Sequence, residues 1–171
     1  MRAMRVVLWA GWVTACHPEP LLDTAAMAAD PCFSLPNPTL EIGLWDGEAD
    51  VFVSLETPAT IEIMSGPQGG RYVAVGLRAT HLNAWTYIDG TLQASSEDTL
   101  LSEAQPWLDF ECGPYGQDAF GAILPFDASA EELHDTEITV TAKVTDASGH
   151  NARTEVVWRL IDPEQATTSP L

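Results

Sequence analysis

Short runs in which apolar and polar residues alternate fill most of the chain from residue 40 to residue 160. The clearest run has apolar side chains at Ile138, Val140, Ala142 and Val144 and polar side chains between them. A period of two is typical of a β-strand that rests one face on a core and exposes the other to water. The same pattern predicts strands over residues 40–44, 51–55, 60–64, 72–79, 84–88, 91–94, 120–126 and 156–160.

Two Asp-Gly pairs lie between apolar runs, at Asp46-Gly47 and at Asp89-Gly90. Both central positions of a tight hairpin turn favour positive φ, so each pair predicts a β-hairpin. The residues from Ser95 to Asp98 are typical of a helix start, and we expect a short helix through Ala104 and then a loop to residue 119. The segment 128–134 fits either a helical turn or a loop.

This succession of short strands and turns predicts one all-β domain over residues 39–162. An antiparallel β-sandwich is the expected architecture, with a closed barrel as the alternative. The segment from Thr139 to His150 resembles the last hairpin of bacterial immunoglobulin-like domains, which implies an immunoglobulin-like sandwich. Residues 163–171 are expected to form a disordered tail.

The chain begins with MRAMRVVLWAGWVTAC, in which Arg2 and Arg5 precede an uncharged, mostly apolar run over residues 6–15. Ten residues are too few to cross a membrane, which needs about 20, so residues 1–15 are predicted to be a secretory signal peptide. The ending Val13-Thr14-Ala15-Cys16 resembles the lipobox of bacterial lipoproteins. That resemblance implies cleavage before Cys16, acylation of Cys16 with palmitate or a similar chain, and a membrane anchor.

Cleavage after Ala26-Met27-Ala28, giving a freely secreted protein, is the alternative, but this site lies well beyond the apolar run. His17 in the second mature position implies, by the enterobacterial sorting rule, the outer membrane of a Gram-negative cell envelope. Residues 16–38 are rich in proline and alanine and are expected to be a flexible tether. The segment from Ile63 to Gly70 also resembles a turn of uncharacterised bacterial surface lipoproteins.

The mature chain is strongly acidic. Removing Arg2 and Arg5 from the seven basic residues leaves five against 25 acidic residues, a net charge of −20. Because nucleic-acid binding needs a basic surface, this charge argues against a nucleic-acid partner.

Two cysteines remain besides Cys16. Cys32 and Cys112 form an even pair in an oxidising compartment, which predicts a disulfide. The pair lacks the C-x-x-C spacing of a zinc site.

Asp46, Glu48 and Asp50 alternate along the chain and would share one face of an extended strand. Three carboxylates on one face are a candidate Ca²⁺ site, and Asp146 and Asn151 would contribute if the loops meet at one end of the sandwich. A solvated hairpin turn explains the same residues. We therefore expect no cofactor, with Ca²⁺ as the one candidate.

Trp107, Phe110 and Tyr115 lie close together among carboxylates and amides. Aromatic faces beside such groups can bind sugars or cations, so these three residues are the candidate ligand site. Packing of the aromatics over the core is the alternative.

The chain carries no G-x-S-x-G, H-E-x-x-H or phosphate-binding glycine-rich motif. We therefore expect a non-enzymatic, lipid-anchored binding module whose partner is an envelope protein or a glycan. Two other functions stay open. One is a calcium-stabilised adhesion module, and the other is an envelope hydrolase with paired carboxylates and a raised carboxyl pKa.

Overall fold

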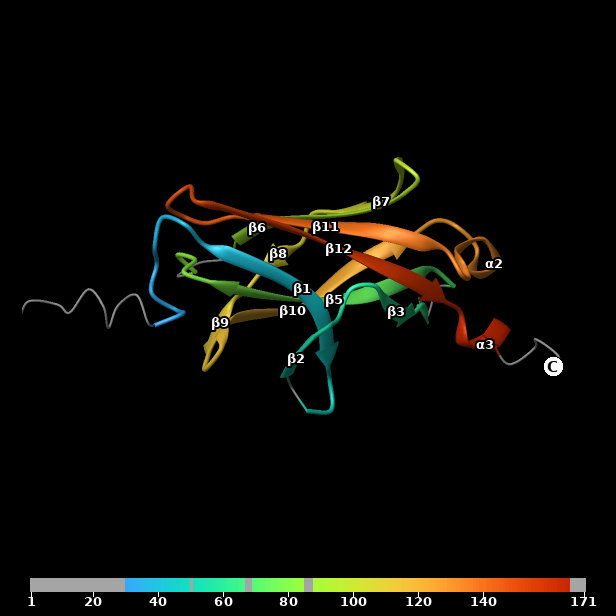
Figure 1. Cartoon of the computed structure of the whole chain (residues 1–171), viewed down its shortest axis with the longest axis horizontal. Coiled ribbons are helices and arrows are strands. Elements are labelled where there is room, and N and C mark those ends of the chain that lie inside the picture. Colours follow the sequence, from blue (N-terminus) through green and yellow to red (C-terminus); the bar gives the residue numbers. More distant parts are fainter. Residues whose placement is uncertain (1–29, 50, 67–68, 85–87, 167–171) are drawn as a thin grey trace, which may run out of the picture.

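A computed structural model of the chain describes residues 30–49, 51–66, 69–84 and 88–166. The signal peptide, Cys16, most of the tether and Asp50 lie outside these residues. Two sheets pack face to face (Figure 1). The predicted all-β sandwich is therefore confirmed, and the closed-barrel alternative is wrong. No helix in the described part of the chain is long and apolar enough to span a membrane.

The first sheet has the strand order β2-β1-β5-β10-β9, with β4 paired to the start of β5. Its strands are β1 (Thr39–Asp46), β2 (Val51–Ser54), β4 (Met64–Ser65), β5 (Arg71–Thr80), β9 (Glu111–Gly113) and β10 (Gly116–Phe126).

The second sheet has the order β3-β12-β11-β6-β7, with β8 paired to the start of β6. Its strands are β3 (Ala59–Glu62), β6 (Ile88–Ser96), β7 (Thr99–Ala104), β8 (Trp107–Leu108), β11 (Glu137–Thr145) and β12 (Asn151–Ile161). Along the described residues every strand pair is antiparallel except β3 and β12, which run parallel.

The core lies between the sheets and follows the predicted alternation. Along β11 the apolar positions from Ile138 to Val144 are buried, and along β12 Trp158 and Leu160 are fully buried. The first sheet contributes the inward positions of β5 and β10, including Val75, Leu77 and Leu124.

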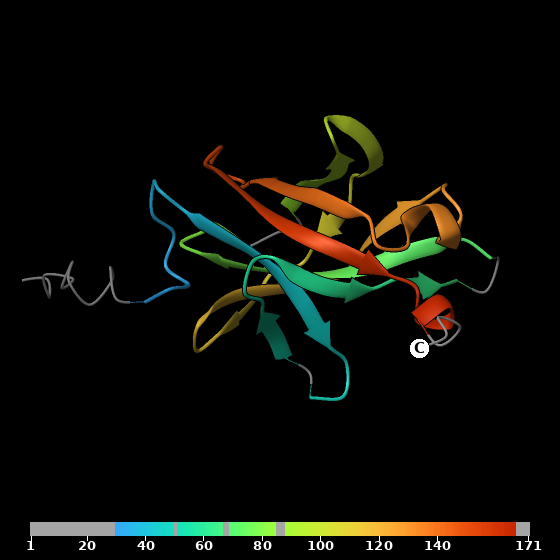
Figure 2. The ribbon, with the colours of Figure 1, turned by 45° about the vertical axis from the view of Figure 1, so that its right-hand side comes forward.

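The hairpin predicted at Asp46-Gly47 is confirmed. β1 and β2 pair antiparallel with Asp46 opposite Val51, and their hairpin projects from the sandwich (Figure 2). The Asp46 carboxylate accepts the backbone N–H groups of Glu48 and Ala49, at 2.9 and 3.1 Å. Asp46 therefore serves the turn itself.

The hairpin predicted at Asp89-Gly90 is wrong, because both residues lie inside β6. A Cβ at position 90 would lie 2.6 Å from the Leu108 side chain, so glycine admits the packing of β8 and makes no turn here. The hairpin occurs at Glu97 and Asp98, whose φ values of 45° and 65° suit a two-residue turn.

That turn joins β6 to β7, so the helix predicted through Ala104 is also wrong. Polar residues typical of a helix start serve equally in a tight turn. The expected loop to residue 119 contains β8, β9 and the start of β10. The strand expected over 84–88 falls mostly outside the described residues.

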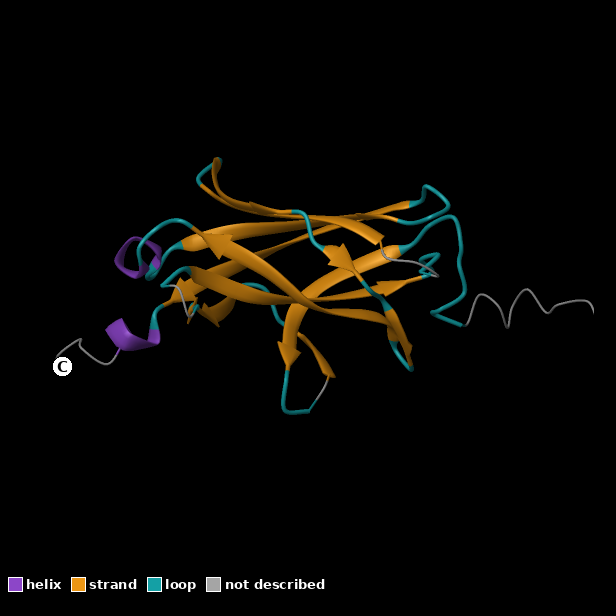
Figure 3. Ribbon diagram, turned by 180° about the vertical axis from the view of Figure 1, so that it is seen from behind, coloured by secondary structure: helices purple, strands orange, loops and turns teal. Residues whose placement is uncertain are grey.

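Two short helices lie at one end of the sandwich (Figure 3). The open choice for 128–134 resolves as α2 (Ala130–Leu133), which Ser129 and Glu132 start with a capping box. The helix α3 (Pro163–Ala166) forms where the expected disordered tail begins. Residues 30–38 lie at the opposite end from α3 (Figures 1 and 2).

Candidate binding site

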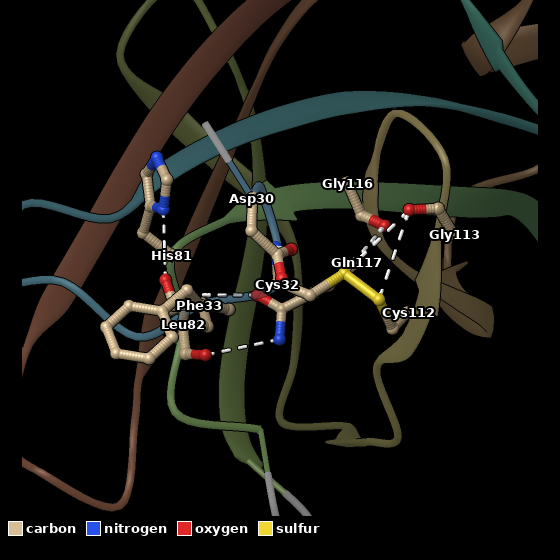
Figure 4. Close-up of a disulfide and its surroundings, with 9 residues drawn as sticks. All are labelled: Asp30, Cys32, Phe33, His81, Leu82, Cys112, Gly113, Gly116 and Gln117. Carbon is tan, nitrogen blue, oxygen red and sulfur yellow. Dashed lines mark hydrogen bonds between the residues drawn. A yellow bond between two sulfur atoms is a disulfide. The ribbon is translucent and has the colours of Figure 1, made fainter. Parts of the chain in front are cut away.

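A disulfide joins Cys32 to Cys112, with their Cα atoms 5.8 Å apart (Figure 4). Cys112 lies on β9, opposite Gln117 of β10. The segment around Cys32 is also held by His81, whose backbone N–H donates to the carbonyl of Pro31 at 2.7 Å. The start of the described domain is thus fixed to the first sheet, as the cysteine pair predicts.

Beside the disulfide lies a small, mostly apolar cavity of about 370 Å³, which Phe110 helps to line. Gln117 closes this region by bonding both backbone groups of Leu82, accepting its N–H at 3.0 Å and donating to its carbonyl at 3.1 Å. Phe110 is only 5% exposed. Its ring is part of the core, so its expected role in ligand binding stays a prediction that is limited to this cavity.

Tyr115 lies at the turn between β9 and β10 and is 75% exposed. Its ring faces the guanidinium of Arg78, 5.8 Å from the ring centroid. Arg78 makes two charge-assisted bonds to Asp118, at 2.6 and 2.7 Å, and lies 4.5 Å from the centroid of the Phe52 ring. The bond to Asp118 raises the pKa of Arg78 above its ordinary value.

This Arg78–Asp118 pair was not predicted, because the two residues are 40 positions apart. Only the register of β10 on β5, which sets Asp118 opposite Arg78, brings them together. The charges satisfy each other between aromatic rings, so we regard the pair as structural.

Trp107 lies on β8, at the edge of the second sheet. It is 80% exposed and stands opposite Asp89 of β6. Leu108 is buried, so the strand alternation directs Trp107 to the outer face. The three aromatics proposed as one ligand site therefore divide among the core, the outer side of the first sheet and the outer face of the second.

A shallow depression follows that outer face of the second sheet. One part, of about 400 Å³, is lined by Thr91, Gln93, Thr141, Lys143 and Arg153. A second part, of about 680 Å³, shares Thr141 and Arg153 with the first and extends towards Glu97 and Glu137. We call the two parts together the outer trough.

Most residues of the outer trough come from β6, β11 and β12, the three central strands of this sheet, and the rest come from the segments beside them. Thr141 pairs with Gln93 on one side and with Glu155 on the other, and Lys143 pairs in the same way with Thr91 and Arg153. The alternation buries Val140, Ala142 and Val144 and turns these polar side chains outward. The pattern that makes the core therefore also makes this surface.

The expected calcium set of Asp46, Glu48 and Asp50 stays a prediction, because Asp50 lies outside the described residues. Asp46 and Glu48 lie at the β1–β2 hairpin. Asp146 is at the other end of the first sheet, because it accepts from Asn83, close to Thr80, which pairs with Thr39 at the start of β1. Nowhere in the described ranges do three or more His, Cys, Asp or Glu side chains form a group suited to a metal ion.

Asp146 has a different role from the one expected. Its carboxylate accepts the backbone N–H groups of Asn83, Ser148 and His150 at 3.0, 2.8 and 2.8 Å, and it also contacts His150 Nδ1 at 3.2 Å. Burial alone would raise the pKa of Asp146, but these hydrogen bonds together lower it. Asn151 is likewise used locally, with its amide bonded to Thr145 and Gly149.

The chain was compared with known protein families and with curated proteins. No family model matches it, and no curated protein matches it in sequence.

Proposed function

We propose that this protein is a non-catalytic binding module, anchored to the bacterial cell envelope through Cys16, that presents the outer face of its second sheet to a partner. The exposure of Trp107 carries the proposal. A tryptophan covers about 150–250 Å², so covering the 80% that is exposed would contribute roughly 3–5 kcal/mol at about 25 cal/mol per Å². Tryptophan is also enriched among the residues that dominate binding energy.

The surroundings of Trp107 support a role in binding. It stands on a strand paired to β6, so its backbone is held by a sheet and loses little freedom when a partner binds. The face beside it offers hydroxyl, amide, ammonium and guanidinium groups.

The position of the domain start also fits an anchored module. Residues 30–38 lie at the end of the sandwich opposite α3, so the chain from Cys16 joins the domain at that end (Figure 1). The 14 residues from Cys16 to residue 29 reach at most about 50 Å. A tether with this maximum reach keeps the domain near one membrane.

A hydrolase is less well supported. A general acid needs a carboxyl group whose pKa is raised, whereas the pKa values of Asp146 and Glu132 are both lowered. In Glu132 the cause is its hydrogen bonds with Ser129, which serve the start of α2.

The proposal is tested in cells that express the full chain. A clickable palmitate analogue should label the wild type in the membrane fraction and should not label Cys16→Ala. A photo-crosslinking benzoylphenylalanine is placed at position 107 and, as the matched control, at position 115, because Tyr115 is similarly exposed beside the other sheet. We expect adducts from position 107 and few from position 115.

Two results would contradict the proposal. Palmitate labelling that persists in Cys16→Ala would contradict the anchor at Cys16. Equal crosslinking from positions 107 and 115, or no crosslinking from position 107, would contradict the proposed binding face.

A further inference from the structure

We infer that the outer trough, with Trp107 at its end, binds an uncharged, hydroxyl-rich oligosaccharide. The inference rests on the proposed function and assigns its ligand class and its site. Three independent features support it: the hydrogen-bonding groups of the trough, its local charge, and the position of the indole ring.

The hydrogen-bonding groups fit a ligand made of hydroxyls, each of which both donates and accepts. Lys143 and Arg153 only donate, whereas the hydroxyls of Thr91 and Thr141 do both. The Lys143 ammonium makes no side-chain hydrogen bond or ion pair with any other described residue, so its three donors face solvent or a ligand.

Carboxylates at the rim supply the acceptors. Glu103 accepts from Gln93 Nε2 at 2.9 Å, and Glu155 lies 3.5 Å from Arg153 Nη2. Each of these carboxylates keeps unused lone pairs for a ligand hydroxyl. The trough therefore presents donors and acceptors side by side, which sugar hydroxyls require.

The charge favours a neutral ligand over an acidic one. Lys143 and Arg153 line the trough together with five carboxylates, so the trough itself is acidic. The carboxylates are those of Glu97, Asp98, Asp135, Glu137 and Glu155. The whole chain carries −18 and repels polyanions at long range. An acidic polymer is repelled by the trough and by the whole chain, whereas an uncharged polymer is not.

Trp107 provides an apolar platform at one end of the trough. It is opposite Asp89, and Thr91 follows two residues later on the same face of β6. Such diagonal neighbours on a sheet lie about 7–8 Å apart, within reach of an aromatic side chain. The C–H face of a sugar ring can pack on the electron-rich indole face while its hydroxyls reach the trough.

The dimensions point to a chain of sugars and not to a single ring. Asp89, opposite Trp107, pairs with Thr145, and the trough continues along β11 to Thr139, six residues away. At about 3.3 Å per residue this length is about 20 Å. We therefore expect the affinity to increase from a monosaccharide to an oligosaccharide.

The test uses the purified full chain in detergent. It is run by affinity electrophoresis through neutral β-1,4-glucan, β-1,3-glucan, α-1,6-glucan, mannan, xylan and galactan, and through the acidic polymers alginate and polygalacturonate. We expect retardation by at least one neutral polymer. Trp107→Ala should weaken this binding at least tenfold, and Thr141→Val, which keeps the shape and removes the hydroxyl, at least threefold.

Tyr115→Ala is the matched control and should bind as the wild type does. Near-ultraviolet circular dichroism checks that Thr141→Val keeps the fold, so that a loss of binding reports the hydroxyl.

Binding only to acidic polymers, or binding that Trp107→Ala leaves intact, would overturn the inference. If no polymer binds and position 107 still crosslinks to a protein, the sugar assignment fails and the proposed binding module stands. If position 107 also gives no adduct, both fail.

Discussion

Replacement of Asp146 should destabilise the domain through a small set of identifiable hydrogen bonds. Its carboxylate, with no exposed side-chain surface, holds the backbone N–H groups of Asn83, Ser148 and His150. It thereby ties the connection after β5 to the turn between β11 and β12. In Asp146→Ala these three donors lose their acceptor.

A partly buried donor left without a partner costs about 1–3 kcal/mol. Three donors at the low end of that range predict a loss of about 3 kcal/mol for Asp146→Ala. Asp146→Asn keeps the oxygen that serves Ser148 and His150 but replaces the one that serves Asn83, so we expect a loss of about 1–2 kcal/mol. At about 3–6 °C per kcal/mol for a domain of this size, Asp146→Ala should melt about 10–15 °C lower.

The pH dependence of the unfolding free energy gives a second, independent test of the role of Asp146. The pKa of Asp146 is lower in the folded chain than its ordinary value of about 3.9, so the unfolded state binds the proton more readily. The stability that the carboxylate contributes is therefore complete above the ordinary pKa. It is lost as the pH falls from about 4 towards the lowered value.

The assay is urea unfolding of the full chain, followed by circular dichroism between pH 7 and pH 3. The difference in unfolding free energy between wild type and Asp146→Asn should shrink below pH 4. A loss under about 0.5 kcal/mol for Asp146→Ala at pH 7, or a difference that does not change with pH, would refute the reasoning.

Three further substitutions test the packing. Cys112→Ser removes the disulfide to Cys32, which is 80 residues away in the sequence. Chain entropy predicts that the unfolding free energy falls by up to about 4.5 kcal/mol. Equal melting temperatures of the wild type with and without reductant would contradict this. Gly76→Ala places a Cβ 2.8 Å from the backbone oxygen of Leu44. The unfolding free energy measured in urea should fall by about 1–3 kcal/mol because of this overpacking. An unchanged urea midpoint would show that β1 can shift to make room. Phe110→Ala should cost about 3–5 kcal/mol in the same assay because the ring is buried, and a near-neutral effect would return this residue to the ligand site.

Local sequence patterns were sufficient to predict a strand and its buried side where the strand has one apolar face. The alternation from Ile138 to Val144 predicted both the strand and its buried side, because successive side chains of a strand must point to opposite faces. The turn at Asp46 was also predictable, since the carboxylate bonds the backbone within three residues.

Local sequence patterns failed to predict the local structure where contact with a distant segment determines it. Gly90 has the sequence of a turn, but its lack of a side chain accommodates Leu108, 18 residues away. Glu97 and Asp98 fit a helix start and a hairpin turn equally well. Pairing of β7 with β6 selected the turn, and that pairing cannot be read from these residues alone.

The sequence by itself determined the all-β class of this protein, its acidic charge and the cysteine pair that forms its disulfide. The tertiary structure alone decided which residues share a surface. Trp107, Phe110 and Tyr115 lie within nine positions, yet β8 pairs with the second sheet and β9 with the first, which carries the three rings to separate places. Strand pairing is non-local, so the outer trough forms only when β6, β11 and β12 come together.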